Sequence, residues 1–200
     1  MNVKNGMQRL SNLNVIVAAT IENGIGLSNS NSMPWRLSNE LKFFAKVTST
    51  KLETQEDPNV VIMGRKVWDS IPQKFKPLRN RQNVILSRTN DLQINDNVKL
   101  LHNVESAIAY TNEAKSRVFC IGGAQIYNQM IPYASRVFMT RVKSPSFEEA
   151  DVKFPELRDN EWRRCTHEDF EKYVGFEVQE GDIEENGVIY EFQMYERVSQ

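Results

Sequence analysis

Short apolar runs rich in β-branched residues recur along the chain, and segments with helical periodicity separate them. The runs are Asn14–Thr20, Val60–Met63, Asn83–Ser87, Arg117–Ile121 and Arg136–Val142. Runs of this length and composition are typical of strands that are buried on both faces of a sheet. The helical segments are Leu37–Val47, Arg65–Ser70, Val104–Thr111 and Ala124–Met130. This alternation predicts a mostly parallel central sheet with helices on both faces.

The last part of the sequence has a different pattern. Val174–Val178 and Val188–Tyr195 are extended apolar runs, and the polar segment between them contains the pair Asn186-Gly187. An Asn-Gly pair between two such runs indicates a β-hairpin, so we expect an antiparallel hairpin at one edge of the sheet. The chain has no internal repeat and no long linker. We therefore predict a single α/β domain over residues 13–198, preceded by a frayed polar tail at residues 1–12.

Composition excludes several classes of protein. The 200 residues carry a net charge of −1 and are 40% hydrophobic, as is typical of soluble globular proteins. No apolar run approaches the length of a membrane span, and the N-terminal residues lack a signal-peptide core. Two cysteines and two histidines, all isolated in the sequence, predict neither a disulfide framework nor a metal site. We expect a cytoplasmic protein that binds neither membranes nor nucleic acid.

Glu40 interrupts the apolar face of a predicted helix. Positions 37, 40, 41, 44 and 47 share that face, and the other four are apolar. Burying a carboxylate costs on the order of several kcal/mol unless the group is paired or hydrogen-bonded. One interpretation places Glu40 at the edge of the face, in water near the positive end of the helix dipole. The other makes it an anionic acceptor for a ligand in an apolar pocket.

Three predicted strands end in residues suited to binding anions. Arg117–Ile121 is followed by Gly122-Gly123 and a helix, Val60–Met63 by Gly64-Arg65-Lys66, and Asn83–Leu86 by Ser87-Arg88. Glycines allow a phosphate to approach the backbone, and parallel sheets bind ligands beyond the carboxyl ends of their strands. Each motif alone is weak, but together they favour a dinucleotide that bears an additional 2′-phosphate. The fingerprint G-x-G-x-x-G is absent, because Gly24-Ile25-Gly26 continues as Leu27-Ser28-Asn29.

The chain resembles the dihydrofolate reductase family, of the eukaryotic type. The resemblance covers residues from about Leu13 to Glu196 and rests on motifs in the family's order: Ile16–Ala19, Asn23–Gly26, Met33–Trp35, Asn39-Glu40, Val61–Lys66, Trp68, Ser70–Pro72, Pro77-Leu78, Arg81, Leu86–Arg88, Ile121–Tyr127 and Thr140-Arg141. It implies a monomeric oxidoreductase that uses NADPH to reduce 7,8-dihydrofolate to tetrahydrofolate, with a hydride to pterin C6 and a proton to N5. It also implies a role in one-carbon metabolism and binding of antifolate inhibitors.

The resemblance also implies roles for individual residues. Glu40 would hold the pterin, Thr140 would hydrogen-bond Glu40, and Trp35 would bind an ordered water. The expected substrate-binding positions are Ile16, Val17, Ala18, Met33, Glu40, Leu41, Phe44, Ile71, Leu78, Arg81, Ile121, Tyr127 and Thr140, of which Arg81 would grip the α-carboxylate of the glutamate tail. The expected cofactor positions are Ala18, Ile25, Gly26, Gly64, Arg65, Lys66, Val67, Leu86, Ser87, Arg88, Ile121, Gly122, Gly123, Ala124, Gln125, Ile126 and Tyr127.

Two departures from the family pattern bear on ligand binding. Val67 stands where a threonine usually follows the Gly-Arg-Lys element, so a hydroxyl contact to the cofactor's phosphate region is lost. The loop between Gly26 and Met33 is about two residues longer than usual and consists mainly of Ser and Asn. A polar loop of this kind has little to pack, and we expect it to be mobile.

Two other functions remain to be distinguished. A related NADPH-dependent reductase acting on a pyrimidine or another pterin predicts a different residue at Glu40 and no arginine at Arg81. A non-catalytic paralogue that binds RNA or another partner predicts loss of Glu40, Trp35 or the glycine pair. All of these residues are present.

Overall fold

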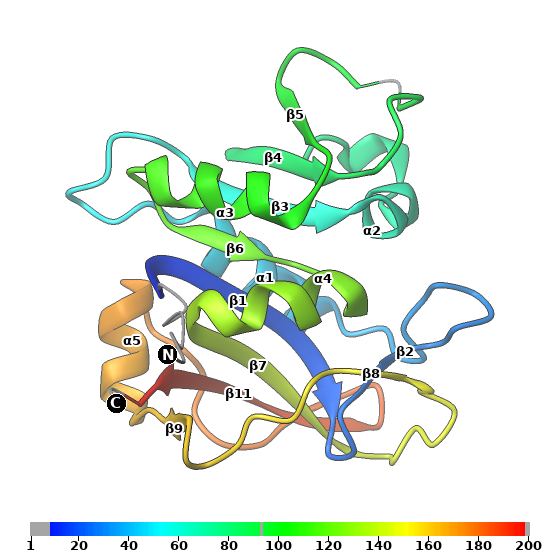
Figure 1. Ribbon diagram of the computed structural model, residues 1–200. Coiled ribbons are helices and arrows are strands. Elements are labelled where there is room, and N and C mark those ends of the chain that lie inside the picture. The colour runs from blue at the N-terminus through cyan, green and yellow to red at the C-terminus, as the bar shows by residue number, and fades with distance from the viewer. Residues whose placement is uncertain (1–8, 93, 199–200) are drawn as a thin grey trace, which may run out of the picture.

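The computed structural model describes residues 9–92 and 94–198, and within these residues the chain forms one large sheet covered by helices (Figure 1). The strands of this sheet are β1 (Leu10–Thr20), β3 (Asn59–Gly64), β4 (Arg81–Leu86), β5 (Val98–Leu101), β6 (Val118–Cys120), β7 (Ala134–Ser144), β9 (Trp162–Arg164), β10 (Ile183–Glu185) and β11 (Val188–Arg197). Two further strands, β2 (Gly24–Gly26) and β8 (Val152–Lys153), pair with each other. The five strands predicted from the apolar runs are confirmed.

Most of the sheet is parallel, as predicted. Its order is β10-β11-β7-β1-β6-β3-β4-β5, and β9 pairs with β11. The six strands from β7 to β5 pair in parallel, while β11 is antiparallel to β7, β9 and β10. The carboxyl ends of the parallel strands therefore meet at one edge of the sheet, which lies to the right in Figure 1.

Five α-helices cover the two faces of the sheet in the described part of the chain: α1 (Ser38–Ser49), α2 (Arg65–Ser70), α3 (Val104–Glu113), α4 (Ala124–Met130) and α5 (His167–Val174). Alternate residues of each strand point to opposite faces. On β3, Val61 and Met63 belong to the core beneath α1, α2 and α5, whereas Val60 and Ile62 belong to the core beneath α3 and α4. The prediction of helices on both faces is confirmed.

The antiparallel hairpin is confirmed, but its first strand was predicted in the wrong place. β10 is Ile183–Glu185, and Val174–Val178 is not a strand, because Val174 ends helix α5. Local signals define that helix. The Thr166 hydroxyl accepts a hydrogen bond from the Asp169 amide at 3.1 Å, and Gly175 ends the helix with a left-handed φ of 79°.

The predicted frayed tail is wrong for its last residues. Leu10, Ser11 and Asn12 begin β1, and the Leu10 side chain is buried. The Asn12 side chain donates to the carbonyl oxygens of Thr111 at 2.8 Å and Ala114 at 3.0 Å, so it ties this strand to the end of α3. Residues 1–8 lie outside the described part of the chain.

Within residues 9–92 and 94–198, none of the helices has both the length and the apolar content needed to cross a membrane.

Candidate functional site

The strand ends that were predicted to bind a ligand meet at one edge of the sheet. The Gly64 amide at the end of β3 donates to the Gly122 carbonyl, which follows β6, at 2.7 Å. The Tyr127 hydroxyl on α4 donates to the Ile16 carbonyl on β1 at 2.7 Å. These contacts hold the ends of β3 and β6 together and tie the start of α4 to the middle of β1. Figure 1 shows α2 beside the end of β3.

Glu40 is buried at this edge. Only 6% of the residue is exposed, and one carboxyl oxygen, Oε1, accepts a hydrogen bond from the Thr140 hydroxyl on β7 at 3.2 Å. Burial raises the pKa of Glu40 from 4.5 to about 7, the hydrogen bond from Thr140 opposes this rise, and the negative charge of Glu185 adds to it. The carboxyl group is therefore poised to exchange a proton near neutral pH.

The buried face of α1 differs in part from the predicted one. Leu37, Glu40 and Val47 are buried as predicted, but Phe43 takes the place expected for Leu41, which is 55% exposed. Phe44 is half-buried, and Thr48 is buried as well. The Phe43 ring stacks on Phe192 of β11 with a centroid separation of 3.8 Å. This stacking turns the helix so that residue 43, three positions after Glu40, faces the sheet.

Trp35 lies in the same core. Its side chain is buried, and its ring packs edge-on against Phe147 with centroids 5.2 Å apart. The indole Nε1 of Trp35 is buried and makes no hydrogen bond to any of the described residues. A buried indole N–H requires an acceptor, and a bound water fits this requirement.

The structure brings together many, but not all, of the predicted substrate-binding side chains. Ile16 and Ile121 are in the same core cluster as Trp35, and Ala18, Phe44, Ile71 and Leu78 pack against that cluster. The Val17 side chain lies in the cluster on the opposite face of the sheet, so Val17 reaches this side only through its backbone. Met33, like Leu41, is exposed.

The Gly122-Gly123 turn depends on the absence of side chains. Gly122 has a φ of 102°, and a Cβ added there would lie 2.9 Å from carbon atoms of the Tyr127 ring. A Cβ added at Gly64 would lie 3.1 Å from Cγ1 of Ile126. The N-terminus of α4 thus lies directly against the ends of β3 and β6. At this turn the backbone of residues 122–124 is not covered by side chains of the two glycines.

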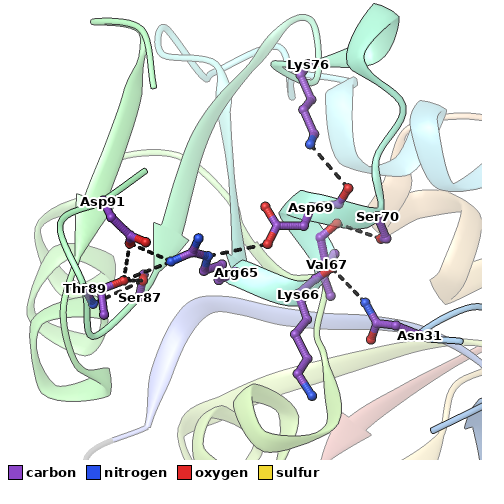
Figure 2. Close-up of polar contacts among 10 residues, drawn as sticks. All are labelled: Asn31, Arg65, Lys66, Val67, Asp69, Ser70, Lys76, Ser87, Thr89 and Asp91. Atoms are coloured by element: carbon purple, nitrogen blue, oxygen red, sulfur yellow. Dashed lines mark hydrogen bonds and ion pairs between the residues drawn. The ribbon is translucent and has the colours of Figure 1, made fainter. Parts of the chain in front are cut away.

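Arg65 was predicted as a phosphate-binding cation, and it already contacts two carboxylates (Figure 2). Its Nη1 lies 2.6 Å from Asp91 Oδ1 and donates to the Thr89 hydroxyl at 3.0 Å, and its Nε lies 3.4 Å from Asp69. These acidic partners raise the pKa of Arg65, and the hydrogen bond that Arg65 donates to Asp91 contributes most. A phosphate bound here would therefore share Arg65 with Asp91.

Other predicted phosphate-binding groups lie around Arg65. The Lys66 side chain is exposed and points away from Asp69 and Asp91 in Figure 2. Ser87 Oγ is 3.3 Å from the Thr89 hydroxyl, and Arg88 is exposed at the end of β4. Ile25 and Gly26 come from β2, Leu86 is the last residue of β4, and residues 124–126 begin α4. The predicted positions on β3, β4 and β6 thus lie at the carboxyl ends of neighbouring strands.

Arg81 lies at the other end of β4, away from the glycine turn. Its Nη1 donates to the Thr48 hydroxyl at 2.8 Å and its Nε to the Arg79 carbonyl at 2.9 Å. Partial burial lowers the pKa of Arg81 from its ordinary value. The two contacts fix the plane of the guanidinium group, which is a useful property for recognising a carboxylate.

The Ser/Asn loop makes more contacts than its composition suggests. The Leu27 amide donates to the Ser32 carbonyl at 2.8 Å, closing the loop on itself. The Ser28 amide donates to Asp151 at 2.8 Å, and the Asn31 side chain donates to the Lys66 carbonyl at 3.0 Å. The loop therefore connects the segment before β8 with the start of α2, through the backbone of Ser28 and the side chain of Asn31.

Sequence reasoning missed two acidic residues at the site. Asp91 lies four residues after Ser87, but its pairing with Arg65 depends on the path of the chain after β4. Glu185 contacts the N-terminus of α1 from a hairpin about 150 residues away in sequence. Helix α1 gave one indirect signal, because Leu37, at its N-cap position, has no side chain that can accept a hydrogen bond.

Comparisons with known proteins identify the family to which the chain belongs. The family model described as dihydrofolate reductase matches residues 12–197. Dihydrofolate reductase from Pneumocystis carinii is 37% identical over 96% of this chain and 99% of its own length, and that from Candida albicans is 38% identical over 91% and 96%. The structure of Schistosoma mansoni dihydrofolate reductase has a TM-score of 0.75 and 27% identity, and the match covers 93% of this chain and 98% of that one. The chain therefore belongs to the dihydrofolate reductase family of oxidoreductases, as its motifs predicted.

Proposed function

We propose that this chain reduces 7,8-dihydrofolate to 5,6,7,8-tetrahydrofolate with NADPH. The observation that carries the proposal is the Glu40 carboxyl group, buried and hydrogen-bonded to Thr140 beside the glycine turn that joins β6 to α4. When bound, the cofactor supplies a hydride, which we assign to pterin C6. A spectrophotometric assay of NADPH consumption with dihydrofolate tests the proposal, and absence of turnover in folded protein would refute it.

In this proposal Glu40 holds and orients the pterin. An ionised carboxylate accepts hydrogen bonds from the pterin amino group and the adjacent ring N–H, and the apolar surroundings strengthen both bonds. Thr140 fixes one carboxyl oxygen of Glu40 through its hydroxyl group. Trp35 holds an ordered water through its buried Nε1. Because the pKa of Glu40 is about 7, the group favours protonation at N5, with water as the final donor.

The residues at the strand ends suit a phosphate-bearing dinucleotide. A Cβ at Gly64 or Gly122 would fill space that the close packing of α4 leaves only for backbone. Lys66, Ser87 and Arg88 supply an ammonium, a hydroxyl and a guanidinium group for phosphates, in addition to the shared Arg65. Backbone amides at the start of α4 can bind a further phosphate oxygen.

Replacing Val67 by threonine should tighten NADPH binding. Val67 lies against the glycine turn, with its Cγ2 3.7 Å from a Cβ built at Gly123. A threonine hydroxyl there restores one hydrogen-bond donor for the phosphate region, worth about 1 kcal/mol or roughly fivefold in Kd. Fluorescence titration with NADPH measures the change. Val67→Ala, which adds no donor, should show no tightening, and an unchanged Kd in Val67→Thr would disprove the hydroxyl argument.

Replacing Arg81 by leucine should weaken binding of the substrate's glutamate tail. Losing a hydrogen-bonded partner of a carboxylate typically costs about 2–5 kcal/mol, so we expect KM for dihydrofolate to rise by about 30-fold or more. A dihydropterin that lacks the glutamate tail should show the same KM in both proteins. If both substrates are affected equally, Arg81 supports the fold through Thr48 and does not bind the carboxylate.

Two other functions can be separated by the same assays. A reductase for a pyrimidine or another pterin would turn over its own substrate faster than dihydrofolate. A non-catalytic paralogue would bind a ligand or partner without consuming NADPH. The combination of Glu40, Arg81 and the glycine pair favours dihydrofolate reduction over both.

The proposal extends to the cellular role of the chain. Tetrahydrofolate production would supply one-carbon metabolism for thymidylate and purine synthesis, in the cytoplasm. Antifolates that carry a protonated amino-substituted ring would bind Glu40 by charge-assisted hydrogen bonds. We propose a monomer, which sedimentation can test.

A further inference from the structure

The helix that carries Glu40 has no cap from its own sequence. Leu37 occupies the N-cap position and provides no side-chain hydrogen bond. The first turn of a helix leaves four amides without partners inside the helix, and they need acceptors. Here the acceptors come from Glu185 on β10. Its Oε1 accepts from the Ser38 amide at 2.6 Å, and its Oε2 accepts from the Asn39 amide at 3.0 Å.

The carboxylate that caps α1 is itself held in place. Oε2 of Glu185 accepts a hydrogen bond from the Tyr190 hydroxyl at 3.1 Å, and the Tyr190 ring is fully buried. Next to Glu185, the Asn186 side chain donates to the Arg36 carbonyl at 3.3 Å. The β10–β11 hairpin therefore grips the N-terminus of α1 at several points. Glu185 is tied to α1 on one side and to β11 on the other.

Glu40 follows the two capped amides directly. It is the third residue of α1, after Ser38 and Asn39, so any shift in the start of the helix moves its carboxyl group. Among the described residues, the Glu40 carboxyl group accepts a side-chain hydrogen bond from the Thr140 hydroxyl, at 3.2 Å. A displacement of about 1 Å in such a site is enough to lower turnover strongly.

We infer that Glu185 is a positioning residue for this reaction, because it caps α1 from the opposite hairpin and holds the Glu40 carboxyl against Thr140. The inference rests on the proposed function of Glu40. In the proposed role, Glu185 does not contact the substrate. It acts through the backbone amides of Ser38 and Asn39.

The charge of Glu185 acts on Glu40 as well. Burial is the largest cause of the raised pKa of Glu40, and the negative charge of Glu185 raises it further. The other titratable groups near Glu40 are the Tyr127 hydroxyl on α4 and the Tyr190 hydroxyl on β11, and the pKa of each is raised, mainly by burial. Both tyrosines are neutral near pH 7, so Glu185 is the charged group that acts on Glu40 from the hairpin.

Glu185→Gln tests the inference, and Glu184→Gln is the matched control. Glu184 is the neighbouring residue of β10, is exposed, and loses the same charge when replaced. For Glu185→Gln we expect kcat/KM for dihydrofolate at pH 7 to fall about five- to tenfold. The apparent pKa in the pH profile of turnover should fall by roughly half a unit. Glu184→Gln should change neither quantity.

The outcomes separate the inference from the proposed function. A wild-type protein that does not reduce dihydrofolate removes both. If the wild type is active and Glu185→Gln has the same rate and pH profile as Glu184→Gln, the inference is overturned but the proposed function stands. If Glu185→Gln does not fold, Glu185→Asp decides, because it keeps the charge but shortens the reach to the amides. We expect this variant to have a lower kcat/KM with an apparent pKa near that of wild type, and a wild-type kcat/KM would overturn the inference.

Discussion

Replacing Glu40 by glutamine is expected to lower kcat for dihydrofolate reduction at pH 7 by about a hundredfold or more, with the fold intact. A glutamine amide cannot carry the negative charge that binds the pterin amino group and ring N–H together, and it cannot take part in proton transfer. The spectrophotometric assay measures the rate, and circular dichroism checks folding. Wild-type turnover in this variant would contradict the role proposed for Glu40.

The same substitution should make the protein more stable than the wild type, by an amount that increases as the pH rises. Below pH 4.5 Glu40 is neutral in both the folded and the unfolded state. Between pH 4.5 and about 7 the unfolded state loses its proton first, so the free energy of unfolding of the wild type falls. The glutamine variant does not titrate at this position. Its stability relative to wild type should therefore increase over this interval, by up to about 3 kcal/mol, and then remain constant.

Urea unfolding of both proteins at several pH values measures this difference. The Glu184→Gln variant is a suitable reference, because it makes the same chemical change at an exposed carboxylate. A constant difference between Glu40→Gln and wild type from pH 4 to 8 would mean that Glu40 does not titrate with a raised pKa.

Replacing Gly122 by alanine is expected to destabilise the protein by about 2–5 kcal/mol. The φ of 102° is unfavourable for any residue with a Cβ, and the new Cβ would lie 2.9 Å from the Tyr127 ring. The ring cannot move away easily, because the Tyr127 hydroxyl bonds to the Ile16 carbonyl at 2.7 Å. The Gly122 carbonyl is likewise held by the Gly64 amide. Urea unfolding measures the loss.

Gly175→Ala is the matched control for Gly122→Ala. Gly175 also has a positive φ, of 79°, but a Cβ added there meets nothing within 4 Å. Its replacement should cost only the backbone term, about 1 kcal/mol. Equal losses in the two variants would show that the contact with Tyr127 is unimportant and that the backbone conformation alone explains the cost.

The sequence predicted the parts of this fold that depend on local patterns. Buried strands such as Val60–Met63 consist of contiguous apolar residues, and the alternation of strands and helices predicts a mostly parallel sheet. The order of the strands, in which β1 lies between β7 and β6, was not predicted, because it depends on contacts between distant segments. Helix α5 had local signals as well, in Thr166 and Gly175, but the apolar residues from Val174 to Val178 suggested a strand. Leu41 and Phe43 are both apolar, and contacts of Phe43 with distant residues, Phe170 and Phe192, accompany its burial in place of Leu41.

The candidate site was predictable where a motif lies on one segment, and not where it is assembled from several. Gly64-Arg65-Lys66 and Gly122-Gly123 could be recognised in the sequence as glycine turns at strand ends, where we propose that the phosphates of the cofactor bind. The pairing of Arg65 with Asp91 and the cap on Ser38 by Glu185 could not, because each joins segments whose approach is set by the whole sheet. In the functions proposed above, the first pairing weakens the attraction of Arg65 for a phosphate and the second positions Glu40.

The cap on α1 has a consequence for the order in which a newly synthesised chain gains activity. Glu40 is synthesised before Thr140, which follows 100 residues later, and before Glu185, which follows later still. A nascent chain that stops before β10 has the acid without the carboxylate that caps its helix. If Glu40 has the proposed role, a chain during translation gains activity late, after the hairpin that contains Glu185 has been made and has docked.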